Sequence, residues 1–221
     1  VFRELYVVDE KNRLMGYLDI SDVLRVVDTK SNVTIKGFVR EAAQVARDTP
    51  LTEVARAIMD AYTNSAAVVD EDGVLQGGVL FSELFPVLIS RRNIPGRVGD
   101  VMTQEPVTCA PEEPIHKIYS LIVSSGFIAF PVVQKDEVIG IVSRRDLLRA
   151  GNVRISVKNQ ADTTVDRVMT TPVISVTPDD QVATAARLMV DHDISILPVI
   201  DERKRIVGVI DRHDVSSCLI P

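Results

Sequence analysis

One short phrase recurs four times along the chain, and it constrains the fold more than any other feature. A glycine opens an apolar stretch, a small polar residue follows in three of the copies, and an acid comes three positions later, at 16–22, 77–83, 140–146 and 208–214. The glycines at 16, 77, 140 and 208 are spaced 61 to 68 residues apart. Self-similarity at such a period indicates duplication of one structural unit. The chain is therefore predicted to consist of four copies of that unit.

The third copy shows the unit most clearly. A short extended run over 106–111 is closed by proline, and apolar residues at helical spacing follow over 114–125, with Gly126 as the expected stop. Two buried-type strands, 129–133 and 138–142, are separated by a polar turn, and a second helix begins at Arg144. The predicted unit is β-α-β-β-α, which makes the fold class α/β (α+β).

The other copies repeat this order to different extents. The fourth has an expected helix over 180–191, with an apolar stripe of Val182, Ala185, Ala186 and Met189. The second has an expected helix over 51–62 and a strand over 66–69. The first shows only its second half, a strand over 5–8 and a helix near 22–27, and is predicted to be truncated.

Composition limits the classes of function. Only 5% of residues are aromatic and there is no tryptophan, so an aliphatic core is expected. A net charge of −6 argues against nonspecific nucleic-acid binding, which requires a basic face. The two cysteines, Cys109 and Cys218, form no metal or disulfide pattern and fit a reducing, cytoplasmic location. No apolar run has the length of a membrane span and no signal peptide is visible, so no membrane association is expected.

Three sequence elements carry a resemblance to a known family. They are Val-Met-Thr at 101–103 and 168–170, proline-led strands at 131–133 and 198–200, and the glycine phrase in all four copies. This combination resembles the CBS domain, a small β-α-β-β-α module named after cystathionine β-synthase. The resemblance implies that the repeats pair into two Bateman modules, with the Pro-Gly segment 93–96 as linker. The expected boundaries are a partial repeat 1 at 1–30, repeat 2 at 36–93, repeat 3 at 97–150 and repeat 4 at 163–221.

The resemblance also implies a ligand. CBS repeats commonly bind AMP, ADP, ATP or S-adenosylmethionine in clefts between paired repeats; the hydroxyl of the phrase contacts phosphate and the acid contacts the ribose. Repeat 3 matches best, because Ser143 can donate to phosphate, Asp146 can accept from ribose, and Arg144 and Arg145 add positive charge. The same Ser-x-x-Asp pattern is also a capping box, which predicts a helix start whether or not a ligand binds.

Two other copies carry a carboxylate where the hydroxyl is expected. Asp19 in repeat 1 and Asp211 in repeat 4 would repel a phosphate at short range. These sites could still hold a ribose through Asp22 or Asp214, and they are expected to take a ligand without a nearby phosphate or to stay empty. Arg212 could partly offset the charge of its neighbour.

Repeat 2 departs furthest from the phrase. Leu80 takes the hydroxyl position and Glu83 the acid position, so this site is expected to be structural. The remaining nucleotide-binding candidates border the expected base and ribose, and for the strand residues a plain core role is the alternative. They are Thr103, Thr108, Thr170, Ala129, Phe130, Pro131, Ile196 and Pro198.

No catalytic or metal-binding constellation is visible. His116, His192 and His213 lie outside any metal-ligand pattern and away from the cysteines in sequence, so the chain is not expected to be an enzyme. Two functions remain open. One is a regulatory module that senses an adenosine-containing ligand, for example for energy sensing, and acts on a protein that the sequence does not identify; the other is an oligomerising scaffold without ligand. The resemblance also implies a homodimer through the CBS modules.

Overall fold

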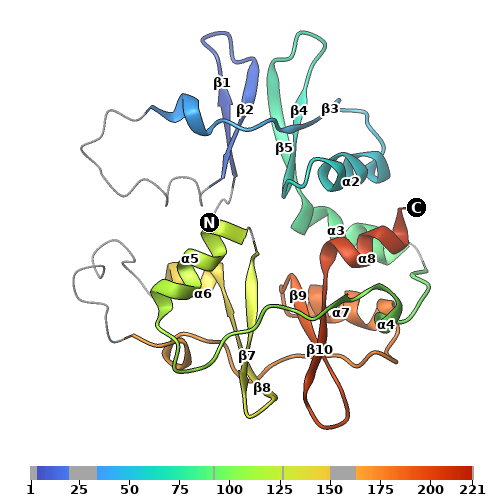
Figure 1. The fold of residues 1–221 in the computed structure, drawn as a ribbon. Helices are drawn as coiled ribbons and strands as arrows, with labels where there is room; N and C mark the ends of the chain where they lie inside the picture. The colour runs from blue at the N-terminus through green and yellow to red at the C-terminus, as the bar shows by residue number, and fades with distance from the viewer. Residues whose placement is uncertain (1–3, 20–33, 92, 126, 150–162, 221) are drawn as a thin grey trace. The chain divides into compact units, whose positions relative to one another are not determined.

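The computed structural model describes residues 4–19, 34–91, 93–125, 127–149 and 163–220 (Figure 1). The chain forms two compact units, Val1–Arg92 with Leu219–Pro221, and Asn93–Cys218. The boundary between the units falls at the start of the predicted linker, 93–96. The predicted helix near 22–27 and the predicted helix stop at Gly126 lie outside the described residues.

Repeat 3 has the predicted order of helix, strand, strand and helix. Its strands are antiparallel, with Phe130 opposite Val142. The turn between them contains Lys135 and Asp136, both with positive φ (51° and 67°), as in the tight turns that match the twist of a hairpin. The elements are α4 (Val98–Val101), β6 (Thr103–Gln104), α5 (Ile115–Ser125), β7 (Ala129–Gln134), β8 (Glu137–Ser143) and α6 (Arg144–Arg149).

The extended run predicted over 106–111 is wrong as a full strand. It forms one parallel bridge, between Cys109 and Val132, in which the amide of Cys109 donates to Pro131 and its carbonyl accepts from Val133. Prolines at both ends of the run have no N–H to donate, which prevents a longer ladder. The same bridge occurs in repeat 4, between Val176 and Val199.

Repeat 4 confirms the prediction made for its helix. All four residues of the predicted apolar stripe, Val182, Ala185, Ala186 and Met189, have no exposed surface. In the second unit the hairpins of the two repeats lie side by side, linked by a bridge between Glu137 and Arg205 (Figure 1). The elements of repeat 4 are η3 (Val165–Arg167), α7 (Val182–Asp191), β9 (Ile196–Ile200), β10 (Ile206–Asp211) and α8 (Arg212–Leu219).

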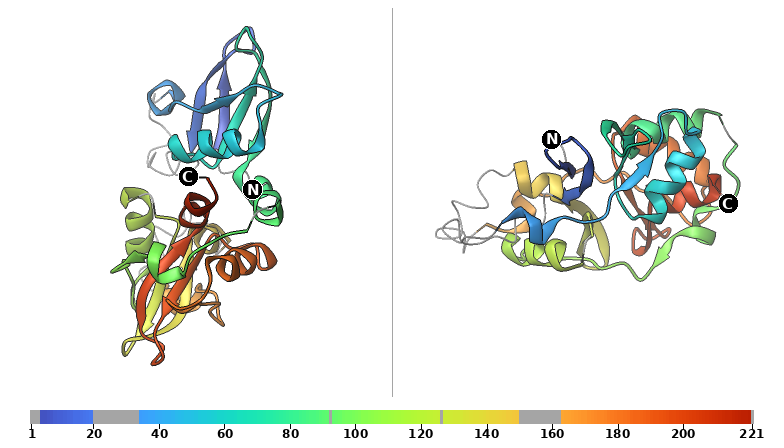
Figure 2. Two further views of the ribbon diagram at one scale, coloured as in Figure 1. Left: turned by 90° about the vertical axis from the view of Figure 1, so that its right-hand side faces the viewer. Right: turned by 90° about the horizontal axis from the view of Figure 1, so that it is seen from above.

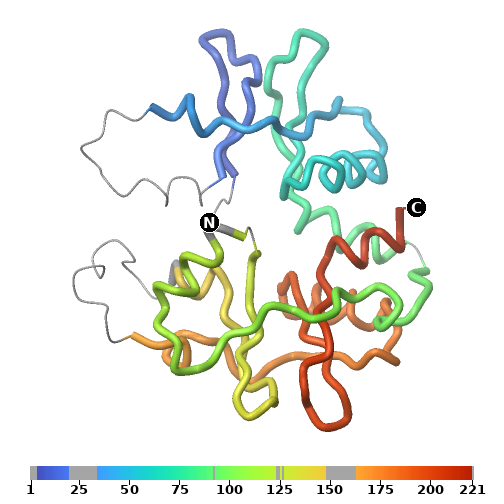
Figure 3. Tube along the Cα trace, viewed as in Figure 1, coloured from blue at the N-terminus to red at the C-terminus, as the bar shows by residue number. Residues whose placement is uncertain are grey.

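Repeats 3 and 4 exchange their first segments. Strand β6 of repeat 3 pairs with β10 of repeat 4, with Thr103 opposite Val209. Thr170 of repeat 4 bridges Ile141 in β8 of repeat 3. Figure 3 shows the segment after α4 running across the β9–β10 hairpin before it reaches its own repeat. Each repeat is therefore completed by residues of the other.

The exchange explains the glycine of the phrase. A Cβ atom on Gly140 would lie 2.5 Å from Sδ of Met169, and one on Gly208 would lie 2.7 Å from Sδ of Met102. The methionine of each Val-Met-Thr segment thus packs directly against the glycine of the partner repeat. Glycine and methionine are required together, although they belong to different repeats.

The core of repeat 3 is aliphatic, as the composition predicted, with Phe130 as its one aromatic member among the described buried residues. Val165, which belongs to repeat 4 in sequence, is fully buried in this core. Its amide donates to the carbonyl of Glu113 at 2.9 Å, while Val98 of repeat 3 donates to Asp180 of repeat 4 at the same distance. The two exchanged segments are therefore anchored in the same way.

The first unit uses the same elements. Helix α2 packs against β3 and β4 (Figure 2). Tyr17 in β2 forms a bridge with Arg40, as Ile141 in β8 does with Thr170, so Arg40 has the position that Thr170 has in repeat 4. The elements are β1 (Glu4–Val8), β2 (Leu14–Asp19), η1 (Ile35–Phe38), β3 (Ala43–Val45), α2 (Leu51–Asp60), β4 (Ser65–Val69), β5 (Leu75–Leu80) and α3 (Phe81–Arg91).

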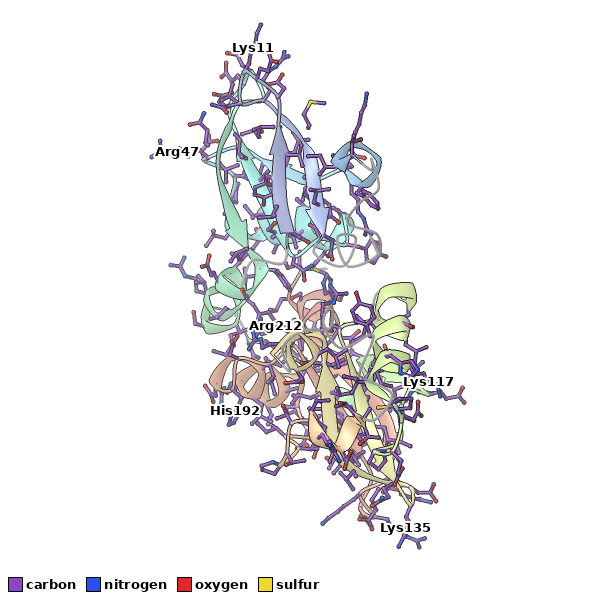
Figure 4. All side chains as sticks on the ribbon, turned by 90° about the vertical axis from the view of Figure 1, so that its left-hand side faces the viewer. Lys11, Arg47, Lys117, Lys135, His192 and Arg212 are labelled. Carbon is purple, nitrogen blue, oxygen red and sulfur yellow. The ribbon has the colours of Figure 1, made fainter. Side chains whose placement is uncertain are left out.

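The hairpin turns share one side-chain arrangement. In repeat 4 the Asp201 carboxylate accepts from the amides of Arg203 and Arg205 and from the Arg205 guanidinium, at 2.8–2.9 Å. Asp9 makes the same three contacts in the β1–β2 turn, at the hairpin tip where Figure 4 labels Lys11. In the β4–β5 turn Asp70 accepts from two turn amides in the same way. Among the described residues, three of the four hairpins therefore close on an aspartate at one position.

Candidate functional site

The best-matched site of the sequence analysis is assembled from two repeats. Ser143 ends β8, and its amide donates to the Asp146 carboxylate at 2.8 Å. The Asp146 amide returns a hydrogen bond to the Ser143 hydroxyl at 3.3 Å, so the predicted capping box is present. The hydroxyl of Thr170, from repeat 4, donates to the other carboxylate oxygen of Asp146 at 3.2 Å. A carboxylate and two hydroxyls therefore converge at the end of β8.

The two arginines of this site have different environments. Arg144 is buried, whereas Arg145 is mostly exposed and lies 3.2 Å from the carboxylate of Asp193. The sequence analysis expected both to add charge for a phosphate. Of the two, Arg145 is the one whose guanidinium remains accessible to a ligand.

The equivalent site of repeat 4 carries two carboxyl groups. The Asp211 carboxylate accepts from the amides of His213 and Asp214, and the Asp214 carboxylate accepts from the amide of Asp211, all at 2.8–2.9 Å. Burial, together with the charge of Asp211, raises the pKa of Asp214 to about 7. Thr103 is exposed beside β10, as Thr170 is beside β8. The site is rich in acceptors and unfavourable for a phosphate.

Arg212 is buried and fixed. It is 7% exposed, and its Nη2 donates to the carbonyl of Met189 at 3.3 Å and lies 3.6 Å from the Asp193 carboxylate. Burial lowers the pKa of its guanidinium, and the charge of Asp193 opposes that shift. Figure 4 labels Arg212 within the second unit.

The predicted strand residues divide into two groups. The register places Ala129 opposite Ser143 and Ile196 opposite Asp211, so both lie next to the phrase residues. The side chain of Phe130 is fully buried in the core, and only its backbone remains for a ligand. Three further candidates, Thr108, Pro131 and Pro198, lie at or beside the parallel bridges rather than at the strand ends.

Of the two site residues predicted in the first unit, the structure describes only one. Asp19 ends β2 and is buried, and Asp22 lies outside the described residues. Sequence reasoning missed a polar network beside it, in which Glu4 accepts from the Asn64 amide and side chain and from the Ser65 hydroxyl, at 2.6–2.9 Å. The Tyr6 hydroxyl donates to Ser65 at 2.7 Å. A charged residue at the start of an apolar strand was the signal that could have revealed this network.

Asp193 is the other functional candidate that the sequence analysis did not identify. It contacts Arg145 of repeat 3 and Arg212 of its own repeat, and both arginines are far from it in sequence. Only its position in the turn after α7 could have drawn attention to it. Within the described residues no cluster of His, Cys, Asp and Glu could hold a metal ion. In the same part of the chain no helix is both long and apolar enough to cross a bilayer.

Comparison with known proteins assigns the family. A family model described as the CBS domain matches residues 98–152 and 165–220. The chain belongs to the CBS domain family. The matched residues include the described elements of repeats 3 and 4, from α4 to α8.

Solved structures share the CBS fold over nearly the whole chain. Protein MJ1225 of Methanocaldococcus jannaschii, described as a candidate archaeal homologue of g-AMPK, superposes with a TM-score of 0.82 at 20% identity, over 98% of this chain and 87% of that one. An uncharacterized conserved protein from Pyrococcus horikoshii gives 0.74 at 22% identity, over 99% and 91%.

A curated relative of known activity shares only part of its length with the chain. A homoserine O-acetyltransferase of Methanosalsum zhilinae is 32% identical over 123 residues, which are 55% of this chain and 24% of the transferase. The chain therefore spans about a quarter of that relative, and the match does not extend its activity to this protein.

Proposed function

We propose that this CBS chain is a regulatory module that binds an adenosine-containing ligand between repeats 3 and 4. The observation that supports this most directly is the contact between Asp146 of repeat 3 and Thr170 of repeat 4. A carboxylate accepts hydrogen bonds from adjacent ribose hydroxyls. The hydroxyls of Ser143 and Thr170 both donate to Asp146 in this structure, and each can turn to donate to a phosphate once the ribose occupies that carboxylate.

A ligand in such a site contacts both repeats at once. Its affinity then depends on how the two repeats are placed, and ligand binding favours the arrangement that binds best. This is how we propose that the module acts on a regulated protein, without catalysis of its own. Formation of a homodimer through the CBS modules belongs to the same proposal.

The two sites are proposed to prefer different ligands. The Ser143 site, with Arg145 beside it, suits a phosphate-bearing nucleotide such as AMP, ADP or ATP. The site of Asp211 and Asp214 suits an adenosyl group without a phosphate nearby, as in S-adenosylmethionine, because two carboxyl groups already lie there.

We also propose that β1 and β2 are the second half of a first repeat, which makes four repeats in two modules, with the boundaries given above. Leu5 is 59% exposed, whereas the residues at the same register position in the other repeats, Ala66, Phe130 and Leu197, are at most 1% exposed. Gly77 has no neighbour within 4 Å of an added Cβ, unlike Gly140 and Gly208. In the other repeats, the first half of a repeat covers the positions equivalent to Leu5 and Gly77.

Calorimetric titration with AMP, ADP, ATP, S-adenosylmethionine and adenosine tests the ligand proposal. We expect Asp146→Asn, which keeps the helix cap, to weaken nucleotide binding by about 10- to 100-fold, the usual effect of losing hydrogen bonds to a charged group. Thr170→Val, in the other repeat, is expected to weaken it by about 10-fold. Thr184→Val, at an exposed position on α7, is the matched control and should bind like the parent.

Two results would reject the proposal. One is the absence of heat with all five ligands from a parent protein that circular dichroism shows to be folded, which would favour an oligomerising scaffold. The other is parent-like affinity of both the Asp146 and the Thr170 variants, which would place any ligand elsewhere.

A further inference from the structure

One carboxylate joins two arginines of different repeats. Oδ2 of Asp193 lies 3.2 Å from Nη1 of Arg145 in repeat 3, and Oδ1 lies 3.6 Å from Nη2 of Arg212 in repeat 4. Asp193 belongs to the turn after α7, where its φ is 49°. Two positive charges therefore meet at a single negative one.

The two arginines differ in how strongly they need an anion. Arg212 is almost fully buried and its guanidinium is positioned by the Met189 carbonyl, so its charge is poorly solvated. Arg145 and Asp193 have side chains that are 58% and 69% exposed. Exposed ion pairs contribute little to stability, because water screens their charges. Asp193 is thus bound only weakly by Arg145, although the buried charge of Arg212 strongly favours an anion beside it.

The location connects this cluster with the ligand site. Arg145 lies between Ser143 and Asp146 in the first turn of α6, so the arginine that Asp193 binds is adjacent along the chain to the residues of the site proposed for the nucleotide. Repeat 3 has no carboxylate at the corresponding place, because Gly126 stands three residues before β7, as Asp193 stands three residues before β9. The cluster is therefore specific to one side of the repeat pair.

We propose that Arg145 and Arg212 form a phosphate subsite that Asp193 occupies as an internal anion until a phosphate-bearing ligand displaces it. This inference rests on the proposed nucleotide site and deepens it by assigning the phosphate contacts. A phosphate carries more charge than a carboxylate and offers more acceptor oxygens, so it can satisfy both guanidinium groups together. Displacement breaks the ion pair between Asp193 and Arg145, which links ligand binding to the contact between repeats 3 and 4.

Asp193→Asn tests the inference by removing the charge while keeping the shape of the side chain. Asparagine has the same shape and tolerates positive φ, so the turn should be kept. We expect the variant to bind AMP about 3- to 10-fold more tightly than the parent and to bind adenosine with unchanged affinity. Asp191→Asn, an exposed change of equal charge two residues away, should bind both ligands as the parent does.

A second arm needs no nucleoside. In pyrophosphate titrations followed by thermal unfolding, Asp193→Asn should gain more stabilisation than the parent, and adding Arg145→Gln should remove that gain. If AMP does not bind but pyrophosphate acts in this way, the nucleotide proposal fails and the anion subsite stands.

The inference is overturned if Asp193→Asn binds AMP no more tightly than the parent while the parent binds it. It is also overturned if Asp191→Asn tightens binding equally, because a general field effect would then explain the gain. The inference is also overturned if pyrophosphate stabilises Asp193→Asn no more than it stabilises the parent.

Discussion

Asp214→Asn is expected to stabilise the protein at pH 8 and to lose this advantage as the pH falls toward 4. Burial and the nearby charge of Asp211 raise the pKa of Asp214 from an ordinary value of 3.8 to about 7. The folded state therefore binds one more proton than the unfolded state between these values, and stability falls as the pH rises through 7. Above pH 7 the ionised carboxyl costs about 2–4 kcal/mol, which the amide avoids.

Urea unfolding of the parent and the variant at several pH values measures this difference. Asp201→Asn is a control of opposite sign, because hydrogen bonds from the Arg205 amide and side chain lower the pKa of Asp201. That variant should be less stable than the parent at neutral pH, and its deficit should close only as the pH falls below about 4. If the stability difference between Asp214→Asn and the parent does not change with pH, the pKa of the Asp214 carboxyl is not raised.

Gly208→Ala is expected to destabilise the second unit by about 1–3 kcal/mol, the usual cost of inserting a methyl group into a packed contact. The new Cβ would lie 2.7 Å from Sδ of Met102 and 2.9 Å from the carbonyl oxygen of Thr103. The methionine can turn away, but the carbonyl belongs to the β6 backbone that pairs with β10, so the strand itself must shift.

Gly77→Ala is the matched comparison, because Gly77 has the same register position in repeat 2 and open space around it. It should be neutral or stabilising by up to about 1 kcal/mol, since alanine lowers the entropy of the unfolded chain. Hydrogen exchange of amides in each unit gives the two effects separately, because protection is measured amide by amide. Equal effects of the two substitutions would mean that the methionine contact has no energetic role.

Elements with a local signal were predictable from the sequence. The apolar stripe of α7 is buried as expected, and β9 contains the proline-led strand predicted at 198–200, because helical spacing and a short apolar run between polar turns are local patterns. The Ser-x-x-Asp pattern likewise predicted the capping box at Ser143. The strand predicted over 106–111 was wrong, because the pairing of a proline-bounded segment depends on the strand beside it and is not a local pattern.

The composition of the site was only partly predictable, since it depends on the exchange between repeats. Thr103 and Thr170 were recognised as candidates, but each lies beside the phrase of the other repeat. Asp193 gave no signal because its partners are 48 residues before it and 19 after it. Such contacts depend on how two repeats pack, and no spacing within one repeat encodes that packing.

The exchange of segments also bears on how the protein is made. Val165 completes the core of repeat 3, yet it follows α6 in the chain. During synthesis repeat 3 must therefore remain with an open core until residues of repeat 4 have left the ribosome. Because such non-local contacts slow folding, repeats 3 and 4 should reach the native state together. In a chain that ended between the two repeats, helices α4, α5 and α6, strand β6 and the β7–β8 hairpin would lack the residues that close their core.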